Sequence, residues 1–303
     1  MLPITVPKLE RRLYILYKLA NNQQLTFSYN HMTQYLHLVT NPYLGINSDA
    51  WIPSTALLHP EASDMVNAGY FFHKKSYQFS AELYYKQLQN VTNYVDGKNL
   101  FLNNADWEQN VQTGKGSTYG IELMAEKRTE KWQVHIGYTL SWNWRRFNEI
   151  NNGQKFPFKY DRRHDLNVAL NYRHNKHWDF TALWAFASGD VYTLPDRIYP
   201  DFDNAQQIND PLSPYEYRLI YQSSATNRYR TLPYHRLDIS GSYQHQFPKI
   251  KSATLTMGIY NVYGSPSQYV YALEGMIGKR SLVVATKYEF FNITPYISYT
   301  VRF

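Results

Sequence analysis

The sequence predicts an all-β protein, namely a portion of an antiparallel transmembrane β-barrel of about 12 strands with short periplasmic turns and long extracellular loops. Three features predict it: strands that alternate between apolar and polar residues, an unusual composition, and connections that alternate between short and long. The 303-residue chain has 29 Tyr, 7 Trp and a 17% aromatic fraction, yet its mean hydropathy is -0.55. Strands with one face in lipid and the other in water produce such a composition.

The clearest strand covers residues 132–144. Its alternate residues are large and apolar, namely Trp132, Val134, Ile136, Tyr138, Leu140, Trp142 and Trp144. The residues between them are polar or glycine, so the two faces differ completely. At about 3.3 Å per residue the strand covers roughly 40 Å, or about 30 Å in height when tilted by roughly 40°. That height matches the apolar band of an outer-membrane barrel together with its aromatic girdles, and soluble strands are rarely so long.

The same alternation predicts about twelve strands along the chain. Their approximate ranges are 9–19, 25–38, 64–73, 77–94, 117–128, 131–144, 163–173, 177–188, 232–246, 252–272, 280–291 and 293–303. No segment of comparable length has helical spacing, and no run of about 18 apolar residues predicts a transmembrane helix.

The predicted connections differ between the two ends of the sheet. Short turns are expected near residues 21–24, 73–76, 128–131, 174–176 and 248–251, and long segments at 40–63, 95–116, 145–162 and 189–231. Outer-membrane barrels have this asymmetry, with short periplasmic turns and long outer loops. A soluble two-sheet protein usually lacks it.

Charge, cysteine content and the start of the chain limit the function classes. The net charge of +7 comes from basic residues at strand ends and turns, which argues against nucleic-acid binding. Zero cysteines argue against disulfides and thiolate metal sites but leave the compartment open. The first twelve residues, MLPITVPKLERR, lack the pattern of a signal peptide. We therefore expect either the later portion of a longer precursor or a truncated reading frame.

Several stretches together resemble the C-terminal barrel half of TonB-dependent outer-membrane receptors. These are LERRLYILYKLANNQQLTFSYNHMTQYLHLVTN (9–41), WIPST (51–55), GKGSTYGIELMAEK (114–127), YDRRHDLNVALNYR (160–173), LPYHRLDISGSY (232–243) and IYNVYGSPSQYVY (259–271). The resemblance covers nearly the whole chain. It implies a barrel of about 22 strands, filled by an N-terminal plug, that imports scarce nutrients such as siderophores, cobalamin or oligosaccharides with energy from the TonB complex.

The resemblance also implies domain organisation, partners and location. Residues 1–303 are expected to be a partial receptor barrel domain in the cell outer membrane, with the signal peptide, TonB box, plug and remaining barrel strands absent. The expected partners are outer-membrane lipid, the barrel assembly machinery and the missing N-terminal half, which alone would contact the TonB complex. No nucleic-acid partner is expected.

Two sets of residues have expected roles in the membrane. An aromatic girdle at the two interfaces is predicted from the tryptophans on the apolar faces, namely Trp132, Trp142, Trp144, Trp178 and Trp184. The last strand ends on an aromatic residue after apolar alternation, which resembles a barrel assembly signal made of Ile297, Tyr299, Val301 and Phe303. As an edge strand it needs a closing partner.

Two further sets face water. Aromatic residues on the long loops are candidate extracellular ligand contacts, because rigid rings stack on sugars or aromatic ligands with little loss of entropy. They are Trp51, Trp107, Tyr192, Tyr199, Tyr215, Tyr217, Tyr221 and Tyr229. Polar residues on the other strand faces are expected to line the lumen without forming a substrate site, namely Glu82, Lys86, Glu122, Glu126, Asp165, Asn167, Asp238 and Gln244.

No catalytic, cofactor-binding or metal-ligating residue is assigned, and no cofactor is expected. His164 and Asp165 are adjacent on a strand and point to opposite faces, which argues against a dyad. The string DFDN at 201–204 echoes a calcium loop, but its glycine and distal glutamate are out of register. The alternatives to a receptor are a passive porin-like or adhesin barrel, a non-functional truncated fragment, or a barrel enzyme.

Overall fold

The computed structural model describes residues 9–40, 49–95, 107–194, 197–207, 215–223, 225–247, 250–266, 268–276, 282–290 and 292–302. These residues form an all-β structure in which two short 3-10 turns, η1 (Trp107–Asn110) and η2 (Asn151–Gly153), interrupt the strands. Among the described residues, no helix is both long and apolar enough to span a membrane.

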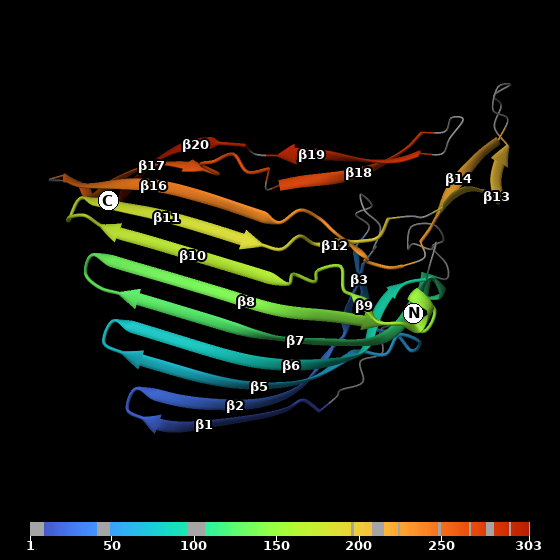
Figure 1. Ribbon diagram of the computed structural model, residues 1–303, viewed down its shortest axis with the longest axis horizontal. Coiled ribbons are helices and arrows are strands. Elements are labelled where there is room, and N and C mark those ends of the chain that lie inside the picture. Colours follow the sequence, from blue (N-terminus) through green and yellow to red (C-terminus); the bar gives the residue numbers. More distant parts are fainter. Residues whose placement is uncertain are drawn as a thin grey trace.

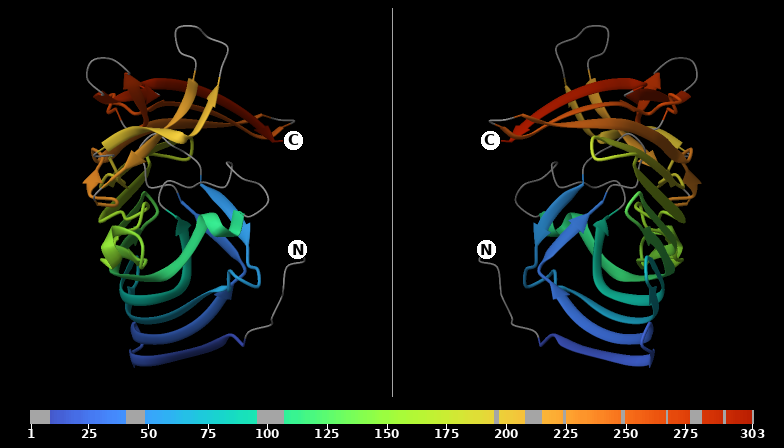
Figure 2. Two further views of the ribbon diagram at one scale, coloured as in Figure 1. Left: turned by 90° about the vertical axis from the view of Figure 1, so that its right-hand side faces the viewer. Right: turned by 90° about the vertical axis from the view of Figure 1, so that its left-hand side faces the viewer.

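One antiparallel, 12-stranded sheet dominates the structure, and neighbouring wall strands follow the order of the chain. The wall consists of β1 (Arg11–Ala20), β2 (Gln23–Gln34), β5 (Glu61–Lys74), β6 (Tyr77–Tyr94), β7 (Val111–Arg128), β8 (Trp132–Arg146), β10 (His164–Arg173), β11 (Trp178–Ala187), β16 (Tyr234–Phe247), β17 (Ile250–Tyr260) and β20 (Thr294–Arg302), with β9 (Phe156–Pro157) paired to β8. Figure 2 shows that the sheet curves into an open wall. The predictions of an all-β fold and of about twelve strands are confirmed.

One of the predicted strands is wrong in its boundaries. The strand expected at 252–272 ends at Tyr260, and β18 (Gln268–Met276) pairs instead with β19 (Leu282–Phe290) in a separate hairpin. A turn causes this break, since Asn261 and Gly264 have φ of 55° and 61°. The Asn261 side chain closes the turn by accepting from the Ser265 amide at 2.9 Å and donating to its carbonyl at 2.8 Å. Such left-handed positions suit Asn and Gly and interrupt a strand.

The connections differ between the two ends of the wall as predicted. Short connections such as 21–22, 75–76 and 129–131 lie at one end, which we call the short-turn end. The other, elaborated end carries additional small sheets, seen on the right in Figure 1. These are β3 (Leu36–Val39) with β4 (Ala50–Pro53), β12 (Val191–Tyr192) with β15 (Tyr229–Arg230), and β13 (Arg197–Gln207) with β14 (Tyr215–Gln222).

Strand register gives the wall one apolar and one polar face. On the apolar face, one row of cross-strand partners runs Tyr29, Val66, Tyr85, Tyr119 and Trp142. The rings of Tyr119 and Trp142 stack with centroids 5.3 Å apart, and those of Tyr85 and Tyr119 with centroids 6.5 Å apart. The rings of Tyr85, Tyr119 and Trp142 therefore form an aromatic band toward the elaborated end, as expected of an interfacial girdle.

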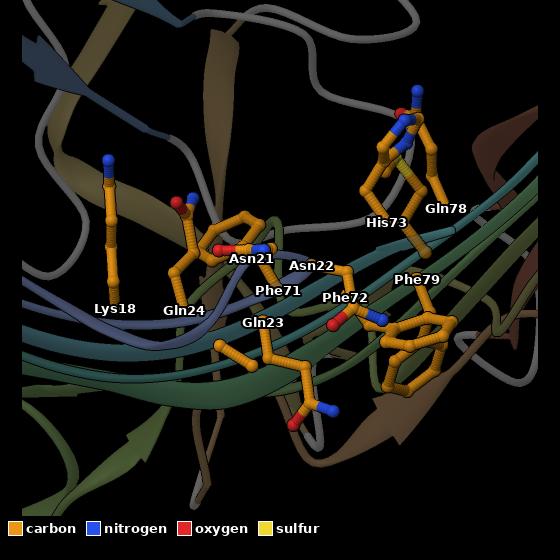
Figure 3. A pocket seen from close by; sticks show the side chains of 12 residues that line it. Lys18, Asn21, Asn22, Gln23, Gln24, Phe71, Phe72, His73, Gln78 and Phe79 are labelled. Atoms are coloured by element: carbon orange, nitrogen blue, oxygen red, sulfur yellow. The ribbon is translucent and has the colours of Figure 1, made fainter. Parts of the chain in front are cut away.

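A hollow of about 380 Å³ at the short-turn end shows the alternation of the two faces directly (Figure 3). Lys18, Gln24 and Gln78 rise from one side of the sheet, whereas Phe72 and Phe79 point from the other. Consecutive strand residues point to opposite faces. Gln78 and its cross-strand partner Glu126 both lie on the polar face.

On the polar face, glycines allow long side chains to lie flat against the wall. A Cβ at Gly120 would lie 2.4 Å from the Leu140 carbonyl oxygen and 2.8 Å from the Tyr84 hydroxyl oxygen. The Tyr84 side chain thus occupies the space that a larger residue at position 120 would need. At Gly137, on the adjacent strand, the nearest atom would be His135 Nε2 at 3.6 Å, so no such contact exists there.

We expect Gly120→Ala to destabilise the folded wall by about 1–3 kcal/mol, because Tyr84 and the strand backbone must move. The midpoint of urea unfolding in detergent micelles measures the loss. Gly137→Ala is the matched control and should leave the midpoint unchanged. Equal midpoints for the two variants would contradict the packing described.

Candidate functional site

The β3–β4 hairpin lies inside the curve of the wall at the elaborated end (Figure 2). A cluster of buried apolar side chains holds the hairpin against the ends of β6 and β7. Its members are Val39, Ile52, Leu58, Tyr94 and Val111, with Trp107 packed against them. The first five are at most 7% exposed, and Trp107 is partly buried. The hairpin is therefore packed against the wall at its elaborated end.

A second buried cluster fixes the connection that follows β8. Phe147, Ile150 and Phe156 from this connection pack on Leu88 and Val91 of β6. The rings of Phe147 and Phe156 have centroids 6.0 Å apart. The connection consequently folds back over the sheet, and residues 157–163 lie at the elaborated end.

Polar contacts join the first and third long connections. Asp49, just before β4, accepts hydrogen bonds from Lys159 Nζ at 2.8 Å and from the Tyr160 hydroxyl at 2.5 Å. Burial, followed by the hydrogen bond to the Asp49 carboxylate, raises the pKa of Tyr160 above its usual value. Tyr160 therefore remains a protonated donor at physiological pH. The two connections are thus tied by an ion pair as well as by packing.

Asp161 joins the third long connection to the fourth. Its carboxylate is 1% exposed and accepts from the Asn143 amide at 2.7 Å, from Arg230 Nη2 at 2.6 Å and from Arg163 Nη2 at 3.3 Å. Arg230 Nη1 also donates to the carbonyls of Asp161 and Gly189, both at 2.7 Å. A buried carboxylate with two guanidinium partners is a fixed structural centre. We call it the Asp161 hub.

The sequence did not point to the Asp161 hub. Asp161 and Arg230 are 69 residues apart, so no local spacing marks them as partners. The acid followed by two arginines at 161–163 was the available signal. Its partner Arg230, on the long 189–231 segment, belongs to no motif that would mark it as a partner of Asp161.

His37 is buried within the β3–β4 hairpin. Its Nε2 lies 3.0 Å from Ser54 Oγ, which in turn donates to the Tyr35 carbonyl at 3.1 Å. Ser54 thus uses its single hydrogen on Tyr35, so His37 Nε2 is the donor to Ser54. His37 Nδ1 is buried and has no hydrogen-bond partner in the described part of the chain. Burial lowers the pKa of His37, which favours the neutral ring.

The eight candidate ligand contacts lie at the elaborated end in three separate places. Trp51, on β4, is 62% exposed, whereas Trp107 packs partly buried against the Val39 cluster. Tyr192 and Tyr229 stack across β12 and β15 with ring centroids 5.9 Å apart. The other four candidates, Tyr199, Tyr215, Tyr217 and Tyr221, lie on the β13–β14 hairpin, whose side chains are outside the described part of the structure. Their role as ligand contacts stays a prediction.

The five predicted girdle tryptophans all lie on the apolar face. At the short-turn end Trp132 packs on Tyr172, and Trp178 on Tyr243, with ring centroids 4.3 and 5.0 Å apart. At the elaborated end Trp142 and Trp144 lie beside Tyr119, to whose hydroxyl Trp144 Nε1 donates at 3.4 Å. The fifth, Trp184, donates through Nε1 to the hydroxyl of Tyr263 at 3.3 Å.

Three of the four residues of the predicted assembly signal lie on one face of β20. Ile297, Tyr299 and Val301 pair in register with Met257, Leu255 and Ala253 of β17. Ile297 is 68% exposed and Tyr299 61% exposed. Phe303 lies outside the described residues.

The polar face carries a row of carboxylates at one level of the wall. Glu82 and Glu122 are direct cross-strand partners, and the row continues through Thr139 to Asp165. Asn67 donates to Glu82 at 3.2 Å. In the described part of the chain, no Lys, Arg or His forms an ion pair with these three acids. Like charges directly opposite on a sheet are destabilising, so the row favours contact with a cationic group.

Within the described ranges, no three His, Asp or Glu side chains gather closely enough to hold a metal ion. The DFDN string lies within the strand β13 and not on a loop.

An antiparallel wall with one apolar and one polar face, short turns at one end and packed loops at the other, defines a membrane-type β-barrel wall. Residues 11–262 match the family described as TonB dependent receptor-like, beta-barrel. The chain belongs to this family, whose fold is that of transporter receptors.

Solved structures share the fold at low sequence identity. The ferric yersiniabactin uptake receptor from Yersinia pestis matches with a TM-score of 0.55 and 14% identity over 95% of this chain and 36% of its own. The ferric-catecholate import receptor from E. coli K12 matches with a TM-score of 0.53 and 14% identity over 95% of this chain and 34% of its own. A copper transporter matches with a TM-score of 0.54 and 14% identity over 96% of this chain and 39% of its own. The chain thus spans between a third and two fifths of each of these proteins. A comparison with curated proteins gave no significant match.

We expect Asp161→Asn to release the long connections, because it leaves the Arg230 and Arg163 guanidinium groups without their buried counter-charge. The cost should be about 3 kcal/mol, equivalent to a roughly hundredfold increase in local opening. Limited trypsin cleavage within residues 188–233 measures it. Asp190→Asn is the control, since Asp190 and its partner Arg162 are half exposed and their ion pair contributes at most about 1 kcal/mol. Equal cleavage rates for the two variants would show that the hub does not fix the connections.

The β3–β4 hairpin should loosen as the pH falls. The folded state holds the pKa of His37 below the unfolded value of about 6.5, so the unfolded hairpin binds the proton more readily. The stabilisation is complete above pH about 6.5 and is lost as the pH falls from there toward the folded pKa. Hydrogen exchange of the hairpin amides at pH 7.5 and 5, corrected for intrinsic exchange rates, measures the change. His37→Gln should abolish the pH dependence, and a variant as pH-sensitive as the wild type would assign it to another group.

Proposed function

We propose that this chain is part of the barrel of an outer-membrane receptor that captures a scarce nutrient at its elaborated end and imports it with energy from the TonB complex. The observation that carries the proposal is the curved wall with an apolar and a polar face in a chain of the TonB-dependent receptor family. The apolar face with its aromatic band fits a membrane position, which in this family is the outer membrane.

We propose that residues 1–303 form a partial barrel domain that is completed by further strands and by a plug. In the described sheet β1 and β20 are the edge strands, and unpaired edge groups in lipid cost several kcal/mol each. Additional strands that close the barrel would pair both edges. The carboxylate row of Glu82, Glu122 and Asp165 would face the lumen, where a basic surface of a plug would supply the missing counter-charge. The TonB complex would act through that plug, and the barrel assembly machinery would recognise β20.

For the ligand we propose a ferric siderophore first, with cobalamin or an oligosaccharide as the next candidates. The similar structures include receptors whose names specify ferric chelates. Aromatics at the elaborated end, namely the exposed Trp51 and Tyr229 and the half-buried Tyr192 stacked on Tyr229, would contact the organic part of such a ligand. A passive pore, an adhesin or a barrel enzyme is less well supported, because the family and fold are those of transporter receptors.

Growth under nutrient limitation tests the proposal. Deleting the gene should abolish growth on one nutrient, tested as a ferric siderophore, cobalamin or an oligosaccharide, and a TonB-deficient strain should show the same loss. Trp51→Ala and Tyr229→Ala should each weaken binding of that nutrient roughly fivefold, corresponding to about 1 kcal/mol. Trp178→Ala, which removes an aromatic at the short-turn end, is the control and should not change binding. Growth that is unaffected on all three nutrients would contradict the proposal, and uptake independent of TonB would favour a passive pore.

A further inference from the structure

We propose that the apolar face of the wall holds one phosphorylated membrane lipid at a fixed position, with an acyl chain in a groove and the phosphate among basic side chains at the groove's end. This site lies on the face opposite the lumen. It requires that the apolar face contacts lipid but not that the protein transports any nutrient.

The first observation is an apolar groove of about 550 Å³ that crosses five neighbouring strands of the wall. Its main lining side chains are Phe27, Val66, Leu83, Tyr85, Tyr119 and Trp142. Five strands at about 4.8 Å spacing give a length of roughly 19 Å. The apolar lining accommodates an acyl chain that lies across the strands against the wall.

The second observation is a group of four cations around the tryptophans at the Trp142 end of the groove. The Arg163 guanidinium lies over the Trp142 ring at 4.7 Å, and Lys155 Nζ over the Trp144 ring at 5.0 Å. Lys115 and Arg146 are exposed direct partners in the β7–β8 register. We call these four residues the basic cluster. Two like charges directly opposite on a sheet repel each other, which an anion between them relieves.

The acid nearest to the basic cluster does not neutralise it. Asp161 contacts Arg163, but its carboxylate is buried and shared with Arg230 in the Asp161 hub. Arg163 Nε is buried and has no hydrogen-bond partner among the described residues. Lys115 and Lys155 form no ion pair within the described part of the chain. The basic cluster therefore keeps a net positive charge at the level where the apolar face meets the lipid head groups.

An anionic head group joined to an acyl chain matches both observations at once. Arg and Lys bind phosphate oxygens through charge-assisted hydrogen bonds, and basic side chains at the membrane surface attract anionic lipids. Free phosphate would leave the groove without a ligand, and a neutral lipid would leave the cations without a counter-charge. The geometry thus selects a phosphorylated lipid of the leaflet at the elaborated end.

Native mass spectrometry of the protein, extracted from its membrane in mild detergent, tests the proposal. The wild type should retain one phosphorylated lipid per chain. Combined Lys115→Gln, Arg146→Gln and Lys155→Gln should lower that occupancy at least tenfold. The matched control is Lys74→Gln, Lys131→Gln and Lys176→Gln, which removes three exposed charges near the short-turn end and should leave the lipid bound.

A second variant tests the groove independently of charge. Ala68→Phe fills the groove, of which Ala68 is a lining residue, and should lower lipid occupancy as strongly as loss of the basic cluster. Ala182→Phe places the same ring on the apolar face of β11, outside the groove, and should have no effect. Absence of retained lipid in the wild type, or equal retention by all variants, would overturn the proposal.

Discussion

Backbone hydrogen bonding between neighbouring strands is the constraint on which the rest of the structure depends. No water pairs with amide groups in the core of a bilayer, so each wall strand must be paired along its length on both sides. The wall meets this requirement from β2 to β17 through antiparallel neighbours that follow one another in the chain. That pairing also sets the register, and the register places apolar side chains on one face and polar ones on the other.

Different interactions stabilise the connections at the two ends of the wall. At the short-turn end the connections need only reverse the chain, and aromatic pairs such as Trp132 with Tyr172 cover the apolar face. At the elaborated end the connections build small cores of their own and join through buried charges at the Asp161 hub. Under the proposed function, a ligand at this end would contact described side chains that these cores hold in place, which reduces the entropy lost on binding.

The sequence predicted the wall well because its signal is local. Alternation from Trp132 to Trp144 is present in the residues themselves, and the structure has β8 at 132–146. The prediction failed at 252–272, where alternation continues across a turn made by Asn261 and Gly264. Period-two spacing reports which face a residue takes, but it does not report whether the chain bends between two strands. The strands of two to four residues within the long connections were missed because so few residues show no period. The longer β13 and β14 were also missed, within the segment 189–231 that the sequence predicted as one long loop.

The sequence by itself determined the fold class, the two faces of the wall, the asymmetry of its ends and the family, because each follows from residue spacing or contiguous motifs. Only the tertiary structure decided which distant side chains meet. Asp49 and Tyr160 are 111 residues apart, and Asp161 and Arg230 are 69 apart. Lys115, Arg146 and Lys155 meet near one pair of tryptophans because β7 and β8 are in register and the following connection folds back. Contacts of this kind depend on register and loop packing, which no single stretch of sequence specifies.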